Sequence, residues 1–230
     1  MRGAKIGLTC ADVPVVPSPR TKLRRKPTRG RYDREAIDAI LDEAMVAHLG
    51  WTHDGQPFVI PTLHARVGDE VYVHGSAASR TIRALRAGAP ACLTVTLLDG
   101  VVLARSAAHH SVNYRSVVVF GSTRPVEDLD LRMKAMQAFT ERLVPGRWQE
   151  IRPPTVKELK AIHVLALPLD EVSAKIRTGP PLDDEDDYAL PAWAGVIPLH
   201  THAGAPVPDP RLASGIAPSP AVGGWTPQRP

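Results

Sequence analysis

The apolar positions of this chain follow a helical period in three places. Ile37, Ile40 and Leu41 recur three and four residues apart, and Asp33 before them is a residue type that favours a helix N-cap. A second run, DLRMKAMQAFTERL, has mixed helical spacing and ends at Pro145-Gly146. The short segment TVKELKA is the third. The pattern predicts one amphipathic helix near the start of the fold and two more in its second half.

Between these helices the pattern changes to short apolar runs separated by turn residues. The runs are AMVAHLGWT, PFVIPTLHARV, VYVHG, APACLTVTLLDGVVLAR, RSVVVFGSTRPVED and AIHVLALPLDEVSAKI. Three pairs typical of hairpin turns stand at Asp54-Gly55, Gly68-Asp69 and Asp99-Gly100. The predicted fold class is mainly β with some helix (α+β), a six-stranded antiparallel meander closed into a small β-barrel with flanking helices.

Composition divides the chain into three parts. Residues 1–30 contain four prolines and no apolar period, which is typical of a flexible arm, and they carry most of the basic excess. Residues 31–181 hold the predicted helices and strands and should form one domain. Residues 182–230 are rich in proline and acidic side chains. This C-terminal extension is expected either to be disordered or to lie across a partner.

The charge of the chain does not alter this division into an arm, a domain and an extension. A formal net charge of +4 and a pI near 9.3 could favour nucleic acid, but no nucleic-acid module follows the basic arm. We therefore expect a solvated tail and no nucleic-acid partner. No run reaches the roughly 18 apolar residues of a membrane span, and no apolar signal core follows the N-terminus. Cys10 and Cys92 lie in unlike surroundings, so a soluble, cytoplasmic protein without disulfide or membrane partner is expected.

One segment combines the residue types that bind an anion. In VYVHGSAASRTIRAL a strand runs into a turn of small residues and then into a helix, where backbone N–H groups and hydroxyls collect. The hydroxyls and the guanidinium of this segment could hold a phosphate through charge-assisted hydrogen bonds. The alternative for Arg80 is a solvated side chain on an exposed helix.

The order of these segments resembles the flavin-binding split-barrel superfamily of pyridoxamine phosphate oxidase, over residues 32–181. It is most similar to the flavin-nucleotide-binding branch that includes the nitroimidazole-resistance reductases. The resemblance implies that FMN binds non-covalently, with its phosphate at Ser76, Ser79, Arg80 and Thr81 of the segment just described. Its isoalloxazine would lie against the backbone of Val59, Ile60, Pro61 and Thr62. The pattern alone leaves a plain edge strand as the alternative, because Pro61 marks an edge or a bulge.

The same resemblance implies further contacts and departs from the family oxidases at two points. Ser116 stands where the oxidases have a flavin-contacting Gln, and the Arg-Leu-His substrate motif is absent, so activity on pyridoxamine phosphate is not expected. Lys175 and Arg177 remain as basic contacts to phosphate or to a partner subunit. His74 matches the reductases' substrate-facing histidine, and its ordinary pKa suits a proton donor.

The resemblance leaves three functions open. The first is an FMN-dependent reductase of a nitro compound or quinone, supplied with hydride by a nicotinamide or another donor, and working as a homodimer whose subunits both line each flavin. The second is a haem b protein in which His109 or His110 ligates iron. The third is a non-catalytic module that binds flavin or a partner, with Trp193 and Trp225 of the extension as docking residues. A deazaflavin could also replace FMN.

Other classes lack their motifs. The sequence contains no dinucleotide-binding Gly-x-Gly-x-x-Gly after a strand, no Walker motif and no Gly-x-Ser-x-Gly elbow. No Cys-x-x-Cys or His-Glu-x-x-His spacing indicates a conventional zinc site. Adjacent histidines on a strand point to opposite faces, so His109 and His110 are not expected to share one metal ion.

Overall fold

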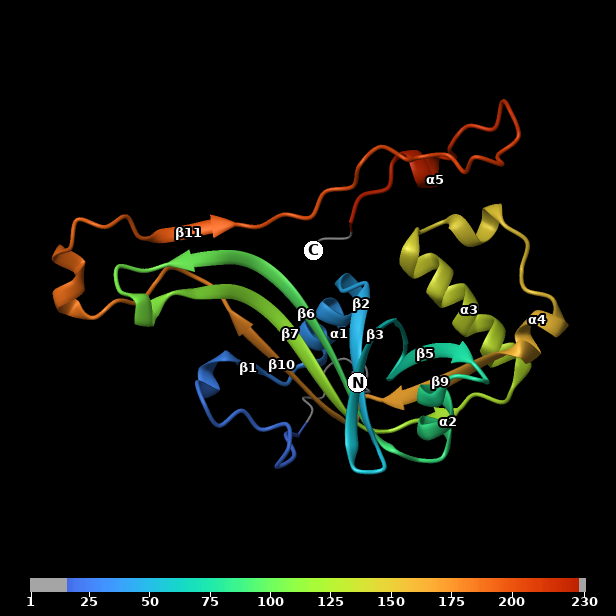
Figure 1. Cartoon of the computed structure of the whole chain (residues 1–230), viewed down its shortest axis with the longest axis horizontal. Coiled ribbons are helices and arrows are strands. Elements are labelled where there is room, and N and C mark those ends of the chain that lie inside the picture. The colour runs from blue at the N-terminus through green and yellow to red at the C-terminus, as the bar shows by residue number, and fades with distance from the viewer. Residues whose placement is uncertain (1–15, 228–230) are drawn as a thin grey trace, which may run out of the picture.

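A computed structural model describes residues 16–227, which form two antiparallel sheets with helices packed around them (Figure 1). The strands are β1 (Gly30–Arg31), β2 (Val46–His53), β3 (Gln56–Leu63), β4 (Ala65–Val67), β5 (Glu70–Ser76), β6 (Pro90–Leu103), β7 (Ser111–Ser122), β8 (Arg124–Pro125), β9 (Ile162–Pro168), β10 (Glu171–Arg177) and β11 (Gly195–Pro198). The α-helices are α1 (Arg34–Glu43), α2 (Arg80–Arg86), α3 (Leu129–Leu143), α4 (Val156–Ala161) and α5 (Pro220–Gly223). Short 3-10 turns are η2 (Pro27–Arg29), η3 (Ala107–His109), η4 (Arg147–Glu150) and η5 (Glu185–Ala189).

The larger sheet has the order β1-β10-β7-β6-β2-β3, with β11 added on β6, and the smaller sheet has the order β4-β5-β9-β8. All of these pairings are antiparallel, and the predicted mainly-β split barrel is confirmed. The strand order is not the expected meander, because β10 pairs with β7 and β9 pairs with β5 across long stretches of sequence. The described strands exceed six, because short edge strands and β11 of the extension join the sheets.

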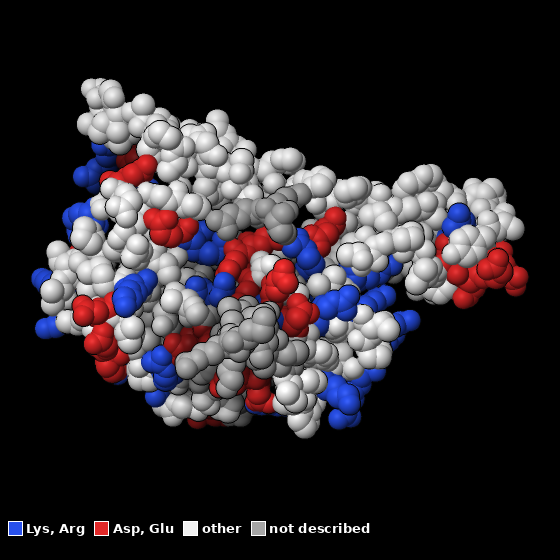
Figure 2. Space-filling view, turned by 180° about the vertical axis from the view of Figure 1, so that it is seen from behind, with Lys and Arg blue, Asp and Glu red and all other residues white. Residues whose placement is uncertain are grey.

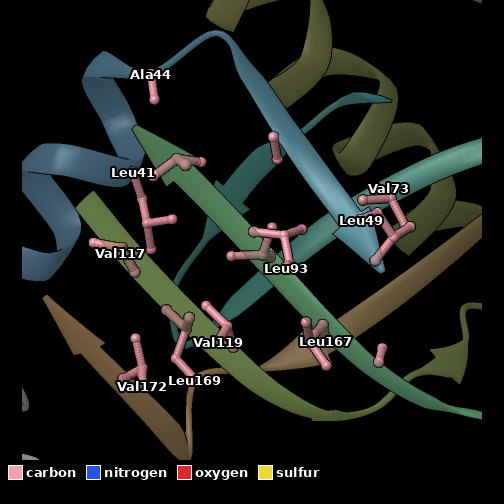
Figure 3. Close-up of a cluster of buried hydrophobic side chains, with 14 of the residues drawn as sticks. Leu41, Ala44, Leu49, Val73, Leu93, Val117, Val119, Leu167, Leu169 and Val172 are labelled. Carbon is pink, nitrogen blue, oxygen red and sulfur yellow. The ribbon is translucent and has the colours of Figure 1, made fainter. Parts of the chain in front are cut away.

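Alternation along the strands places one apolar face of the larger sheet in the core. Leu49, Leu93, Val117 and Val119 point inward from three adjacent strands and are almost fully buried, as is Leu41 from α1 (Figure 3). A second cluster under α3 centres on Phe139, which is 2% exposed, and closes the smaller sheet. These two clusters hold the strand ends and helix starts of the candidate site in place.

Two of the three predicted hairpin turns are present in the structure, and the third is not. Asp54-Gly55 joins β2 to β3 and Gly68 joins β4 to β5, each with the positive φ that such turns require. The prediction of a turn at Asp99-Gly100 is wrong, because β6 continues through both residues with a shift in register. Glycine is needed there for another reason: a Cβ on Gly100 would lie 3.0 Å from Val196 of β11.

The predicted helix starts are confirmed by their caps. The Asp33 carboxylate accepts a hydrogen bond from Ala36 N at 2.9 Å and begins α1. Thr155 and Glu158 form a reciprocal capping box at the start of α4. Local sequence therefore determines where these two helices begin.

The described part of the N-terminal arm is not the solvated tail that its composition indicated. Thr21 is 2% exposed, and Arg20 pairs with Glu171 while its guanidinium lies over the Phe120 ring, 5.2 Å from the centroid. β1 at the end of the arm pairs with β10. The basic residues can contact the barrel because acidic and aromatic side chains of β7 and β10 face them. Residues 1–15, which include Cys10 and the rest of the predicted arm, lie outside the described residues.

The C-terminal extension runs along the top of the long β6–β7 hairpin and returns over α1 (Figure 1). Its strand β11 pairs with the distal half of β6, and residues 220–227 lie against α1 and Pro145 around a cavity of about 730 Å³. Between these contacts, residues 200–218 are exposed. Among the helices described here, none combines the length and the apolarity that crossing a bilayer requires.

Candidate functional site

The turn between β5 and α2 has the predicted form of an anion site. Ser76 Oγ accepts a hydrogen bond from Ala78 N at 3.2 Å, and Ser79 is the N-cap of α2, with a hydroxyl that makes no hydrogen bond to the helix. Gly75 is required at the strand end, because a Cβ there would lie 2.9 Å from Ile82 of α2. The turn from Ser76 to Ala78 is exposed, and Ser79 is half-buried where α2 begins.

Arg80 connects this turn to the edge strand β3. Its guanidinium lies over the Phe58 ring, with Cζ 4.9 Å from the centroid, and it has no carboxylate partner among residues 16–227. Arg80 also lines a cavity of about 540 Å³ between α2 and the β2–β3 hairpin, together with Arg83 and His53. The structure therefore brings the predicted phosphate residue beside the predicted isoalloxazine strand.

The residues predicted along β3 alternate between its two faces. β3 is an edge strand, as Pro61 indicated, since β2 is its only sheet neighbour among the strands of residues 16–227. Val59, 66% exposed, and Pro61 point to the outer face, whereas Ile60 and Thr62 are half-buried on the other. The free edge of β3 offers backbone groups to a flat heterocycle.

Thr81 and Arg177 do not occupy the predicted contact positions. Thr81 is 8% exposed because its side chain points from α2 into the protein. Arg177, 6% exposed, donates to Asn113 Oδ1 and to the carbonyl oxygens of Gly179 and Pro180, the last at 3.2 Å. Its guanidinium closes the end of β10, so it is not available to a phosphate in this arrangement.

Ser116 of β7 and Lys175 of β10 lie side by side on the face of the larger sheet opposite the core. β6 and β2 separate them from β3, the strand that Arg80 contacts. The two residues are register partners across β7 and β10, and the Ser116 hydroxyl donates to the Lys175 carbonyl oxygen at 3.3 Å. A contact of these residues with the same flavin requires a second copy that brings its own α2 turn to this face.

His74 lies on β5 directly before the turn, and its ring packs against Phe139 of α3, with centroids 4.5 Å apart. Its Nδ1 is buried and has no hydrogen-bond partner in the structure. Burial lowers the pKa of His74 below its ordinary value, so that the neutral imidazole is favoured near pH 7. This state is less suited to proton donation than the sequence indicated.

His109 and His110 stand at the tip of the β6–β7 hairpin, in and after η3. His110 Nδ1 donates to the Ser106 carbonyl oxygen at 2.9 Å and the residue is exposed. His109 faces the C-terminal extension, and its Nδ1 lies 3.9 Å from Asp183 Oδ1. Carboxylates rather than apolar walls surround His109, which does not fit the apolar macrocycle of a haem.

Comparison with known proteins identifies the family of this chain. A family model described as pyridoxamine 5'-phosphate oxidase matches residues 33–176, which is more than half of the chain. The chain belongs to this family. No curated protein sequence matches the chain.

Two solved structures resemble this family member closely. The flavocytochrome Anf3 from Azotobacter vinelandii is 44% identical, covers 91% of this chain and 97% of its own, and superposes with a TM-score of 0.85. The FAD and heme binding protein from Mycobacterium smegmatis is 42% identical, covers 86% of this chain and 98% of its own, with a TM-score of 0.83. Coverage of this extent shows that the first of them shares part of the C-terminal extension as well as the barrel.

A third structure shows the fold alone. It is a candidate 5-nitroimidazole antibiotic resistance protein from Bacteroides thetaiotaomicron, 20% identical, which covers 64% of this chain and 86% of its own with a TM-score of 0.53. The branch named from the sequence is therefore represented among the structural relatives of this family member.

Sequence reasoning missed three residues at or near the site. Phe58 carries the Arg80 contact, and an aromatic residue next to the predicted strand segment was the available signal. Arg83 lines the same cavity, one helical turn after Arg80. Arg115, beside Ser116, holds α1 to the bulge in β6 through Glu43 and Asp99. Only the tertiary structure shows that these distant carboxylates meet at one guanidinium.

Proposed function

We propose that this protein is a flavin-dependent redox protein whose flavin phosphates bind between the α2 turn and the edge of β3. The observation that carries this proposal is the position of Arg80, a guanidinium without an acidic partner among the described residues, which lies over Phe58 and lines a cavity. An anion beside Arg80 would gain charge-assisted hydrogen bonds from the guanidinium and the Ser79 hydroxyl.

The protein's own contribution is binding and orientation. A bound flavin supplies hydride and electron transfer. Arg80 and Ser79 would hold its phosphate end, and the free edge of β3 would orient its ring system. The proposed reaction is reduction of a small acceptor of the nitro or quinone type, with a nicotinamide as electron donor. Absence of turnover with every such donor would instead indicate a non-catalytic flavin-binding module.

The cavity favours a dinucleotide flavin over FMN. Arg80 and Arg83 line the same cavity of about 540 Å³, and two guanidinium groups match the two phosphates of a diphosphate, whereas FMN has one. The M. smegmatis relative is described as binding FAD. We therefore propose FAD, and the FMN expected from the motif is the alternative that chromatography of the extracted flavin distinguishes.

Arg80→Ala is expected to weaken flavin binding by about 1.5–3 kcal/mol, which is roughly 10- to 150-fold in dissociation constant, because a hydrogen bond to a charged group is lost. Titration of the apoprotein, followed by flavin fluorescence, measures the change. Arg86→Ala is the matched control, since Arg86 lies on the same helix but pairs with Glu127 at 3.1 Å. Equal affinity of the Arg80 variant and the unchanged protein would remove Arg80 from the site.

Haem is a second cofactor that we propose for this protein, because both of the most similar structures described above are named as haem or cytochrome proteins. Of the three histidines considered, His74 fits an iron ligand best. Its imidazole is favoured in the neutral form, its Nδ1 is free of hydrogen bonds, and Phe139 provides an apolar wall. His74 is two residues before Ser76 on the same strand, β5.

A homodimer is proposed as the functional unit. The outer face of the larger sheet exposes Val46, Val59 and Leu98, which are 51%, 66% and 50% exposed, around the half-buried Ser116 and Lys175. Such an apolar sheet face is typical of an interface. Analytical ultracentrifugation should give twice the mass of one chain, and Val59→Lys should shift the equilibrium to monomer. A monomer at micromolar concentration of the unchanged protein would contradict the proposal.

A further inference from the structure

The tip of the β6–β7 hairpin meets the C-terminal extension at a cluster of metal-ligating side chains. His109 of η3, Asp184 and Asp187 each offer one ligand atom, and these atoms all lie within 4.8 Å of one another. Figure 2 shows acidic residues gathered at this end of the molecule, on the side away from the helices. The residues come from two segments that are far apart in the sequence.

The geometry of η5 separates these acidic residues from their neighbours. In a 3-10 turn, residues three apart lie on the same side, so Asp184 and Asp187 both face His109. Glu185 and Asp186 between them are exposed and do not contribute to the cluster. The Asp184 side chain makes no hydrogen bond to the turn that it begins. Asp184 is exposed as well, so it is position around the turn, and not burial, that separates the two residues facing His109 from Glu185 and Asp186.

The surroundings of His109 suit a ligand. Its Nδ1 is shielded from solvent, has no hydrogen-bond partner among the described residues and lies 3.9 Å from the carboxylate of Asp183, which leaves Nε2 as the ring nitrogen for a metal ion. That carboxylate is fully buried and held by Arg105 through the backbone N–H at 2.9 Å and Nη1 at 3.0 Å. A carboxylate behind a metal-binding imidazole is the arrangement that fixes the ring and increases its basicity.

We propose that His109, Asp184 and Asp187 bind one divalent transition-metal ion, such as Zn²⁺ or Mn²⁺. One imidazole and two carboxylates match the mixed nitrogen and oxygen ligation of these ions, whereas Ca²⁺ and Mg²⁺ prefer oxygen alone. The ion fastens the extension to the hairpin tip. The site lies apart from the flavin turn and from His74, so it is independent of the proposed function.

Binding can be measured on the full chain after treatment with EDTA. Isothermal titration with Zn²⁺, and separately Mn²⁺ binding followed by electron paramagnetic resonance, should show one equivalent bound. His109→Gln and Asp187→Asn should each weaken binding at least tenfold. The matched controls His110→Gln and Asp186→Asn change neighbouring residues of the same types outside the cluster, and they should leave both affinity and bound flavin unchanged.

Several results would overturn the proposal. They are the absence of a one-equivalent phase at 1 mM metal, an equal loss in Asp186→Asn, and an unchanged affinity in His109→Gln. A further measurement tests whether the ion holds the C-terminal extension against the hairpin tip. Hydrogen exchange in residues 183–198 should slow at least severalfold when Zn²⁺ is added to the unchanged protein and should not slow in Asp187→Asn. Equal exchange with and without metal in the unchanged protein would show that the extension is not held by an ion.

Discussion

Arg115→Met is expected to lower the free energy of unfolding by about 3 kcal/mol, because it leaves two carboxylates without their common partner. Arg115 donates to Glu43 Oε1 at 2.9 Å and to Asp99 at 2.7 and 3.0 Å. The Glu43 side chain is only 9% exposed, so water replaces the lost contacts poorly. These hydrogen bonds raise the pKa of Arg115 above its ordinary value, and the side chain stays charged at any accessible pH.

Urea denaturation followed by circular dichroism measures this change in stability. A surface pair is the control: Arg147 contacts Glu150 at 2.8 Å but is 42% exposed, and Arg147→Met should cost no more than about 1 kcal/mol. If the two variants lose the same small amount, the contacts of Arg115 are as weak as those of a solvated pair. A further variant, Glu43→Gln, keeps the shape of the site and should lie between the two.

His74→Ala is expected to abolish the Soret band of the protein reconstituted with haemin, and to leave the flavin bound. The variant would lack the imidazole that we propose to hold the iron, whereas the turn that would hold the flavin phosphates keeps Ser79 and Arg80. The absorption spectrum reports both cofactors at once. Loss of the flavin together with the haem would indicate a collapsed strand rather than a lost ligand.

Two controls make the assignment of the haem ligand specific. His110→Ala should keep the Soret band, because His110 is exposed and its ring is held by Ser106 outside the apolar cluster. His109→Ala should keep it as well, since carboxylates surround that ring. A Soret band that persists in His74→Ala and disappears in either control would show that the iron ligand is His109 or His110 at the hairpin tip. This is the ligand expected from the sequence.

The two proposed cofactors would share one continuous segment of chain. β5 carries His74 against α3, and two residues later the same strand enters the turn that begins α2. The smaller sheet fixes this strand through its pairing with β9 over seven residues, from Glu70 to Ser76.

The sequence alone determined the local elements of this protein. Helix starts at Asp33 and Thr155, the hairpin at Asp54-Gly55 and the edge character of β3 at Pro61 each depend on capping, turn or proline chemistry within a few residues. The strand–turn–helix around Ser79 is local too, and it is what made the family resemblance visible. Local backbone preferences are encoded next to where they act, so these features could be predicted.

The tertiary structure decided how distant side chains pair. It turned Asp99-Gly100 from an expected turn into a bulge, because Arg115 and β11 fix the strand on both sides. It buried Arg177 against Asn113 and His74 against Phe139, and it placed His109 among carboxylates of the extension. Charge and burial at such positions depend on chain segments tens of residues away, and a pattern read over a short window contains no information on them.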